Sequence, residues 1–145
     1  MKGRRFVHLS AAALLCAVVL TACGQRLPEL PAEPAVYARG DFQPAGEESG
    51  YATVEKDGKV FIPYGVLRSR GLFSRLTDAF GPCLGYVEGD EADRIYALAG
   101  ADTDVWLIEY YTAGVMENPV VLREVGSRGA ETPAGVESLG YDYWK

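Results

Sequence analysis

The segment YATVEKDGKVFIPY, residues 51–64, contains the clearest fold signal in the chain. Its two halves alternate loosely between apolar and polar residues, as β-strands with one buried face do. Asp57-Gly58 separates the halves, and this dipeptide strongly favours a two-residue hairpin turn. Pro63 lacks the amide hydrogen that a strand ladder uses, which places the second strand at a sheet edge or at a bulge. The segment therefore predicts an antiparallel hairpin.

Further strand patterns follow this hairpin along the chain. Short apolar or alternating runs, bounded by turn residues, predict four more strands: residues 83–88, 94–99, 105–111 and 119–125. The first two would form a second hairpin, joined by an acidic loop over 89–93. Turns that recur every eight to twelve residues are typical of small all-β domains.

Two short helices are also expected. Leu and Phe recur at helical spacing over 72–80 and stop at Gly81-Pro82. Thr132-Pro133 suits the start of a helix and Gly140 its end. The fold class that we predict is mainly β: a small curled antiparallel sheet or barrel of five to seven short strands with one or two short helices.

The preceding segment has a different composition. Residues 23–50 hold four prolines among Glu, Ala and Gly, which favours an extended tether. At about 3 Å per residue, such a tether would hold a domain formed by residues 51–145 several tens of Å from its attachment point. The tripeptide Arg39-Gly40-Asp41 matches an integrin-binding motif, but three-residue matches are common by chance.

The N-terminus has the layout of a secretory signal peptide. Three basic residues, Lys2, Arg4 and Arg5, precede an uncharged run from Leu9 to Leu20, and small residues follow it. The apolar run is too short for a stable membrane span. We therefore expect residues 1–22 to be a signal peptide that is removed after export.

Leu20-Thr21-Ala22-Cys23-Gly24 resembles the lipobox of bacterial lipoproteins. The resemblance implies that Cys23 carries a diacylglyceryl group and becomes the first residue of the mature chain. Two acyl chains give stable anchoring, since each buried methylene group contributes about 0.8 kcal/mol. The expected location is the extracytoplasmic face of the cell membrane, or the outer membrane if the host has one.

A second resemblance covers most of residues 51–145. The segments that carry it are Ile62-Pro63-Tyr64-Gly65, Cys83-Leu84-Gly85-Tyr86-Val87, Arg94-Ile95-Tyr96, Glu109-Tyr110-Tyr111 and Ser138-Leu139-Gly140-Tyr141-Asp142-Tyr143-Trp144. They are similar to small lipoproteins of unassigned function from clostridia-like bacteria. This resemblance supports a single domain and implies no activity.

Removal of the signal peptide would change which chemistries the chain can perform. It takes away the single histidine, His8, and lipid would occupy Cys23, which leaves Cys83 as the one free thiol. Catalytic Ser–His–Asp and Cys–His arrangements, His-ligated metals and an intramolecular disulfide are then excluded. Eleven basic side chains would remain against twenty acidic ones, a formal net charge of −9. That balance argues against nucleic acid and against a polybasic membrane patch.

Glu109 is the most conspicuous single charge, because the run from Trp106 to Tyr111 is otherwise uncharged. We expect it to be half-buried with a cationic partner: Arg94, Arg68 or Arg123. One interpretation is a general acid whose pKa is raised by burial. The favoured interpretation is a buried ion pair or a hydrogen bond to a tyrosine hydroxyl, because lone buried acids are usually paired.

Several other residues are candidates for binding. Arg68, Arg70 and Arg75 concentrate positive charge in an acidic domain and would suit a phosphate, a polyanionic wall polymer or an acidic partner. The terminal aromatic residues would either pack in the core or line a sugar- or peptide-binding face: Tyr141, Tyr143 and Trp144.

The remaining acidic and thiol side chains are expected to have structural and not functional roles. The acidic side chains of the second hairpin and the next loop are more consistent with solvated turns than with a Ca²⁺ site: Glu88, Asp90, Glu91, Asp93, Asp102 and Asp104. Cys83 is expected to be a buried, inert thiol, because no His or Lys flanks it. We predict no catalytic residue, metal site or cofactor.

The function expected from these features is that of a lipid-anchored, non-enzymatic module that binds an envelope protein or a wall polymer. Its contact with the membrane would be the lipid on Cys23, and nucleic acid is not an expected partner. Two alternatives stay open. One is a carboxylate-based glycan hydrolase centred on Glu109 and a second acid. The other is an inhibitory or structural lipoprotein.

Overall fold

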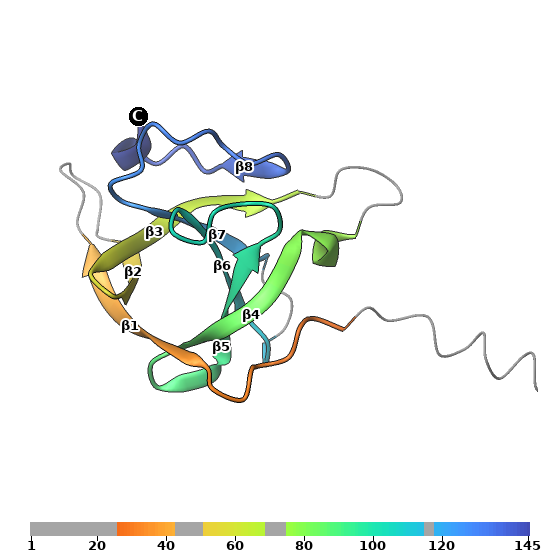
Figure 1. The fold of residues 1–145 in the computed structure, drawn as a ribbon. Coiled ribbons are helices and arrows are strands. Elements are labelled where there is room, and N and C mark those ends of the chain that lie inside the picture. The colour runs from red at the N-terminus through yellow and green to blue at the C-terminus, as the bar shows by residue number, and fades with distance from the viewer. Residues whose placement is uncertain (1–25, 43–50, 69–74, 115–117) are drawn as a thin grey trace, which may run out of the picture.

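The computed structural model describes residues 26–42, 51–68, 75–114 and 118–145. The fold is mainly β, as the sequence predicted, and seven strands close into a barrel (Figure 1). The strands are β1 (Ala35–Phe42), β2 (Tyr51–Lys56), β3 (Lys59–Leu67), β4 (Phe80–Val87), β5 (Asp90–Leu98), β6 (Trp106–Tyr111), β7 (Val120–Glu124) and β8 (Val136–Ser138). The expected signal peptide over 1–22, the lipobox-like residues 20–24 and Cys23 lie outside the described residues.

The barrel closes through a parallel strand pair. Around the ring the order is β1-β2-β3-β7-β6-β5-β4, and each neighbouring pair is antiparallel except β1 with β4. The first residues of β1 lie beside β4, with Tyr37 opposite Val87, and the later residues lie beside β2, with Arg39 opposite Val54. Strand β8 pairs with the far end of β3, outside the ring. Strand β1 therefore joins the two edges that the other strands would leave open.

The hairpin predicted around Asp57-Gly58 is confirmed. Val54 lies opposite Phe61 and Lys56 opposite Lys59 in an antiparallel ladder. Asp57 and Gly58 have φ angles of 52° and 78°, and two left-handed residues are what a type I′ turn requires. The expected bulge is also present, because the pairing of β3 with β7 shifts register after Pro63.

The second hairpin is confirmed in outline, but its loop is shorter than predicted. Strand β5 begins at Asp90, so the turn consists of Glu88 and Gly89, and the acidic residues 90–93 belong to the strand. Gly89 adopts a φ of 92°, which lets the chain reverse within two residues. The predicted loop over 89–93 was therefore too long, although Asp90 and Glu91 are exposed as expected.

Neither predicted helix forms in full. The first part of 72–80 lies outside the described residues; the second part is a single 3₁₀ turn, η1 (Leu76–Ala79), and Phe80 already belongs to β4. The helix predicted over 132–140 was wrong. Those residues contain β8 instead, because Gly135 takes a φ of 87° and Val136–Ser138 hydrogen-bonds along the free edge of β3.

The boundary between tether and domain was also wrong. Residues 35–42, assigned to the tether, form β1, and Leu27 and Leu30 pack against buried residues of the barrel wall. The physical reason is that strand pairing on both sides and the burial of Tyr37 stabilise the extended segment. The tripeptide 39–41 consequently lies within a paired strand.

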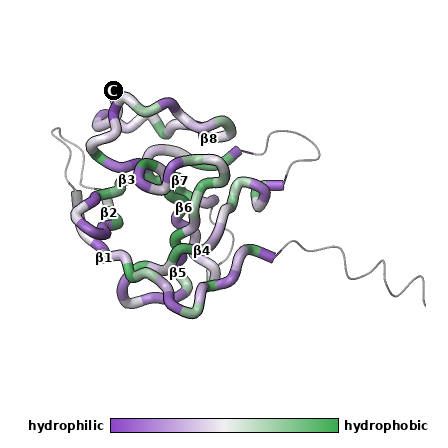
Figure 2. Tube along the Cα trace, in the orientation of Figure 1, coloured by the Kyte–Doolittle hydropathy of each residue, from purple (hydrophilic) through white to green (hydrophobic). Residues whose placement is uncertain are grey.

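The barrel interior is filled by one apolar side chain from each of its seven strands. These seven buried residues are Tyr37, Val54, Phe61, Val87, Ile95, Leu107 and Leu122. A second buried cluster lies on the outer side of the wall: Tyr64, Leu67, Cys83, Tyr96, Leu98, Trp106, Ile108 and Val121. The two clusters alternate along the strands, and Figure 2 shows the most hydrophobic stretches on barrel strands, with β6 among them.

Residues after β7 cover part of the outer wall. Arg123, which is only 4% exposed, anchors them by hydrogen bonds to the carbonyl oxygens of Ser127 and Ala130. Three aromatic rings surround its guanidinium at 4.9–5.2 Å: Tyr64, Trp106 and Trp144. No helix in the described part of the chain is long and apolar enough to cross a membrane.

Candidate binding site at the barrel mouth

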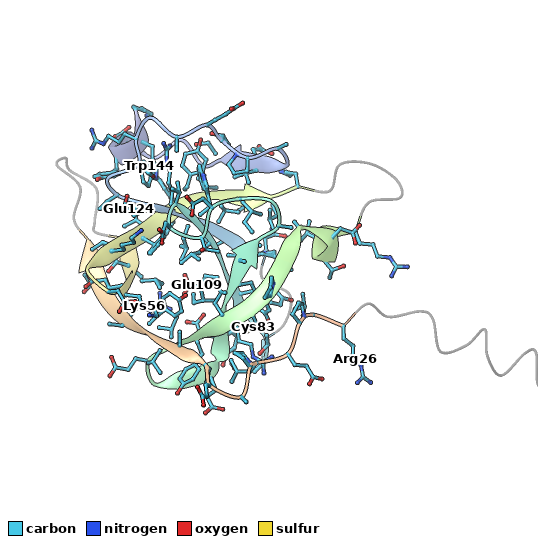
Figure 3. The ribbon with its side chains drawn as sticks, viewed as in Figure 1. Arg26, Lys56, Cys83, Glu109, Glu124 and Trp144 are labelled. Atoms are coloured by element: carbon cyan, nitrogen blue, oxygen red, sulfur yellow. The ribbon has the colours of Figure 1, made fainter. Side chains whose placement is uncertain are left out.

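A second layer of inward positions lies next to the apolar ring. Because strand side chains alternate, residues two positions from the ring face the same interior. Six such residues lie at one end of the barrel: Arg39, Ala52, Pro63, Asp93, Glu109 and Val120. With Tyr110, Tyr111 and Asn118 they line a cavity of about 310 Å³, which we call the barrel mouth. Figure 3 places Glu109 within the ring of strands.

A guanidinium joins two carboxylates in the barrel mouth. Arg39 of β1 donates to Glu109 Oε1 on β6, with an Nη2–Oε1 distance of 2.5 Å, and the same nitrogen donates to Asp93 on β5. Because Ile95 lies opposite Glu109, Asp93 is its diagonal neighbour on the same face of the sheet. The side chains of Asp93 and Glu109 are 17% and 18% exposed, and that of Arg39 is 35% exposed.

The cluster contains more acidic than basic groups, and this affects the pKa values of its members. Burial and the neighbouring charge of Glu109 raise the pKa of Asp93 to about 6, although Arg39 opposes the shift. Burial alone would lower the pKa of Arg39, but its contacts with Glu109 and Asp93 outweigh burial and raise that pKa. The cluster holds one arginine and two acidic side chains, so its formal charge at neutral pH is −1.

The apolar ring lies one layer further into the barrel than the residues that line the mouth. Tyr37 belongs to this ring, and burial raises the pKa of its hydroxyl to about 12. Tyr37 therefore stays neutral at physiological pH. The mouth combines these charged groups with apolar lining residues, Ala52, Pro63 and Val120, an arrangement that suits a small organic ligand with one charged end.

Glu109 has the arginine partner that the sequence led us to expect, but the partner is Arg39. Two of the candidates lie on the other side of the barrel wall, since Arg94 and Arg123 occupy strand positions next to inward-facing residues. The third candidate, Arg68, lies beyond the end of β3 and pairs with Glu137.

The predicted cluster of basic residues is only partly described. Arg68 and Arg75 line a separate cavity of about 430 Å³ between η1 and residues 133–135, whereas Arg70 lies outside the described residues. The pairing of Arg68 with Glu137 reduces the positive charge available to an anionic ligand there. The barrel mouth, not this cavity, has the more buried charges.

The terminal aromatic residues take part in packing. Trp144 packs against the outer-wall cluster and donates its indole N–H to the carbonyl oxygen of Pro63 at 2.9 Å. The Tyr143 hydroxyl donates to the carbonyl oxygen of Val125 at 3.1 Å, and Tyr141 is half-buried at the start of the final 3₁₀ turn, η2 (Asp142–Trp144). These contacts favour the packing interpretation over an open binding face.

Cys83 is buried, as predicted, and burial raises the pKa of its thiol. In the ranges that the structure describes, no three Asp, Glu, Cys or His side chains are grouped so that they could hold a metal ion. The acidic loops instead cap their own backbone, as when Asp102 accepts a hydrogen bond from the Asp104 amide at 2.9 Å.

Two of the three charged residues in the barrel mouth, Arg39 and Asp93, were not predicted as site residues. Arg39 was assigned to the tether, and Asp93 to a solvated loop. The available signal for β1 was the presence of three large apolar side chains, Val36, Tyr37 and Phe42, in a segment otherwise typical of a linker. No protein-family model, curated protein or solved structure matches the chain.

Proposed function

We propose that the mature chain is a lipid-anchored extracytoplasmic protein that binds, without catalysis, a small ligand bearing a cationic group. The observation that carries the proposal is the cluster of Arg39, Asp93 and Glu109 in the barrel mouth. The resemblance of residues 20–24 to a lipobox supports the anchoring.

The charge of the cluster selects the ligand class. Asp93 and Glu109 share the single guanidinium of Arg39, so their oxygen atoms can accept further hydrogen bonds. A cationic ligand group can donate these hydrogen bonds. Partial burial strengthens such contacts relative to those at a fully solvated surface. An anion would instead approach Asp93 and Glu109 in a chain that is already acidic.

The rest of the mouth suits the uncharged part of such a ligand. The apolar lining residues Ala52, Pro63 and Val120 accept a short hydrocarbon chain, and Tyr111, which is 41% exposed, offers an aromatic ring to an ammonium group. A volume of about 310 Å³ is at the small end of the range for ligand pockets, which limits the ligand to a few carbon atoms beyond its charged group.

The geometry does not favour a glycan hydrolase. Asp93 and Glu109 lie on adjacent strands and share one nitrogen of Arg39, so both approach a ligand from the same wall. Glycosidases place their two carboxyl groups on opposite sides of the scissile bond. We therefore assign the carboxylates to binding.

The test uses the chain from residue 23 with Cys23→Ser, titrated with n-butylammonium, butyrate or 1-butanol and followed by NMR. We expect butylammonium to shift amide signals of β5 and β6, and its affinity to fall about tenfold in Glu109→Gln. Lowering the pH through about 6 should weaken binding, because Asp93 becomes neutral.

Glu91→Gln is the matched control, because Glu91 is exposed on the same strand as Asp93. It should bind like the unsubstituted chain. Equal binding of butyrate and butylammonium, no binding of butylammonium, or unchanged affinity in Glu109→Gln would contradict the proposal.

A further inference from the structure

The segment that precedes β1 is docked on the barrel. Leu27 and Leu30 are half-buried against the outer-wall cluster, within residues 26–34, which form no helix or strand. Figure 1 shows this segment running along the outside of the ring, below β4 and β5. Arg26, at its beginning, is exposed, and Figure 3 shows it well away from the barrel strands.

The length of chain before this docked segment is short. Three Cα–Cα steps separate Cys23 from Arg26. Even a fully extended chain covers no more than about 11 Å in three steps. A tether that ran free as far as Tyr51 would instead permit a separation of several tens of Å.

We propose that the lipidated protein lies directly against the bilayer, with the part of its outer wall beside residues 26–34 facing the lipid headgroups. This inference rests on the proposed lipidation of Cys23. Two buried acyl chains hold Cys23 at the membrane surface, and the docking of Leu27 and Leu30 leaves too little chain for the barrel to move away.

The segment carries one basic residue, Arg26, and two exposed acidic residues, Glu29 and Glu33, so the lipid anchor and not the charge of the segment would hold it at the membrane. The mature chain is acidic, so contact with anionic lipids is opposed by repulsion that is screened over about 8 Å at physiological ionic strength. Arg26 is the described residue nearest to the anchor in sequence, and a basic residue there is attracted to anionic headgroups.

The placement leaves the proposed ligand site accessible. The residues that line the barrel mouth come from the strands and from the residues that flank β7, and none belongs to residues 26–34. The docked segment therefore covers the outer wall and not the mouth. A ligand would reach the protein from the aqueous layer close to the membrane.

The experiment attaches lipid chemically and so does not depend on processing in cells. The chain from residue 23 with Cys83→Ala is coupled through Cys23 to a maleimide lipid in phosphatidylcholine–phosphatidylglycerol vesicles. Energy transfer from Trp106 and Trp144 to dansyl-labelled headgroups is compared with that of a chain carrying twelve Gly/Ser residues inserted after Gln25. We expect at least twofold lower transfer from the longer chain.

Release of the docked segment should have the same effect as lengthening it. Leu27→Glu with Leu30→Glu should lower the transfer, whereas Leu139→Glu, at an exposed leucine 45% accessible, should not change it. Circular dichroism verifies that each variant is folded. Equal transfer from the short and lengthened chains overturns the inference.

A separate measurement addresses the anchoring itself. Mass spectrometry of the chain recovered from bacterial membranes should find acyl chains on Cys23. An unmodified Cys23 would overturn the proposed anchoring, whereas equal energy transfer on vesicles would overturn the membrane-facing geometry. The two failures are therefore distinguishable.

Discussion

Inward-facing residues of the barrel differ in chemistry according to their position along each strand. Ile95 and Leu107 fill the fully buried ring, whereas Asp93 and Glu109, two positions further toward the mouth, border the cavity. Only the second layer is close enough to water to keep a charged group ionised. The partial burial of Asp93 is therefore the direct cause of its raised pKa.

The raised pKa of Asp93 predicts an unusual pH dependence of stability. The folded-state pKa of about 6 exceeds the ordinary value of 3.8, so the folded state binds more protons between these values. This contribution is fully present below pH 4 and is lost as the pH rises through 6. At each pH, the free energy of unfolding of Asp93→Asn is compared with that of the wild type. We expect this difference to be about 1–3 kcal/mol more favourable to the variant at pH 7.5 than at pH 4.5.

Urea denaturation at the two pH values measures the effect. Glu91→Gln should follow the wild-type profile, since Glu91 is exposed and takes no part in the cluster. A profile of Asp93→Asn parallel to that of wild type would show that the burial of Asp93 does not couple its ionisation to folding.

Among the elements, β1 depends on an unusually close approach to β4. A Cβ atom added to Gly85 would lie 1.9 Å from the carbonyl oxygen of Ala35, well inside contact distance. Glycine is therefore required at position 85 because the backbone of Ala35 lies so close, and not because a turn needs a left-handed residue there. The close contact occurs at the parallel pairing that completes the ring.

We expect Gly85→Ala to separate β1 from β4. The substitution should lower the free energy of unfolding by about 3 kcal/mol or more, because two backbones must move apart. Hydrogen exchange of the β1 amides should become at least tenfold faster. Gly129→Ala is the matched control, because no atom lies within 4 Å of its added Cβ. Wild-type protection of β1 in Gly85→Ala would contradict this account.

The ring of strands is completed by β1, which precedes the domain predicted from the sequence. Without β1, the edges of β2 and β4 would present unpaired backbone groups. Such edges are prone to pair with other chains. The barrel and the segment before it therefore form one folding unit.

This view predicts different behaviour for two truncated chains. Residues 26–145 should give a monomeric β protein, whereas residues 51–145 should aggregate or remain largely unfolded, because the ring stays open. Size-exclusion chromatography and circular dichroism distinguish these outcomes. A monomeric, fully folded 51–145 chain would show that the barrel does not need β1 in order to fold.

Local patterns were sufficient to predict the β class and several of its elements. The hairpin of β2 and β3, with its left-handed Asp57 and Gly58, follows from residues that are neighbours in sequence. The helix expected over 132–140 shows the limit of this information. Its capping residues are genuine local signals, but pairing of Val136–Ser138 with the edge of β3 overrides them.

The candidate site could be predicted only in part. The composition of the run 106–111 was enough to indicate that Glu109 is half-buried and paired. Its partner Arg39 is 70 residues away, in a segment whose prolines and small residues are typical of a linker. Strand alternation and turn preferences act over a few residues, so they determine which segments become strands. Only closure of the barrel, through backbone pairing between distant strands, decides that Arg39, Asp93 and Glu109 meet in one mouth.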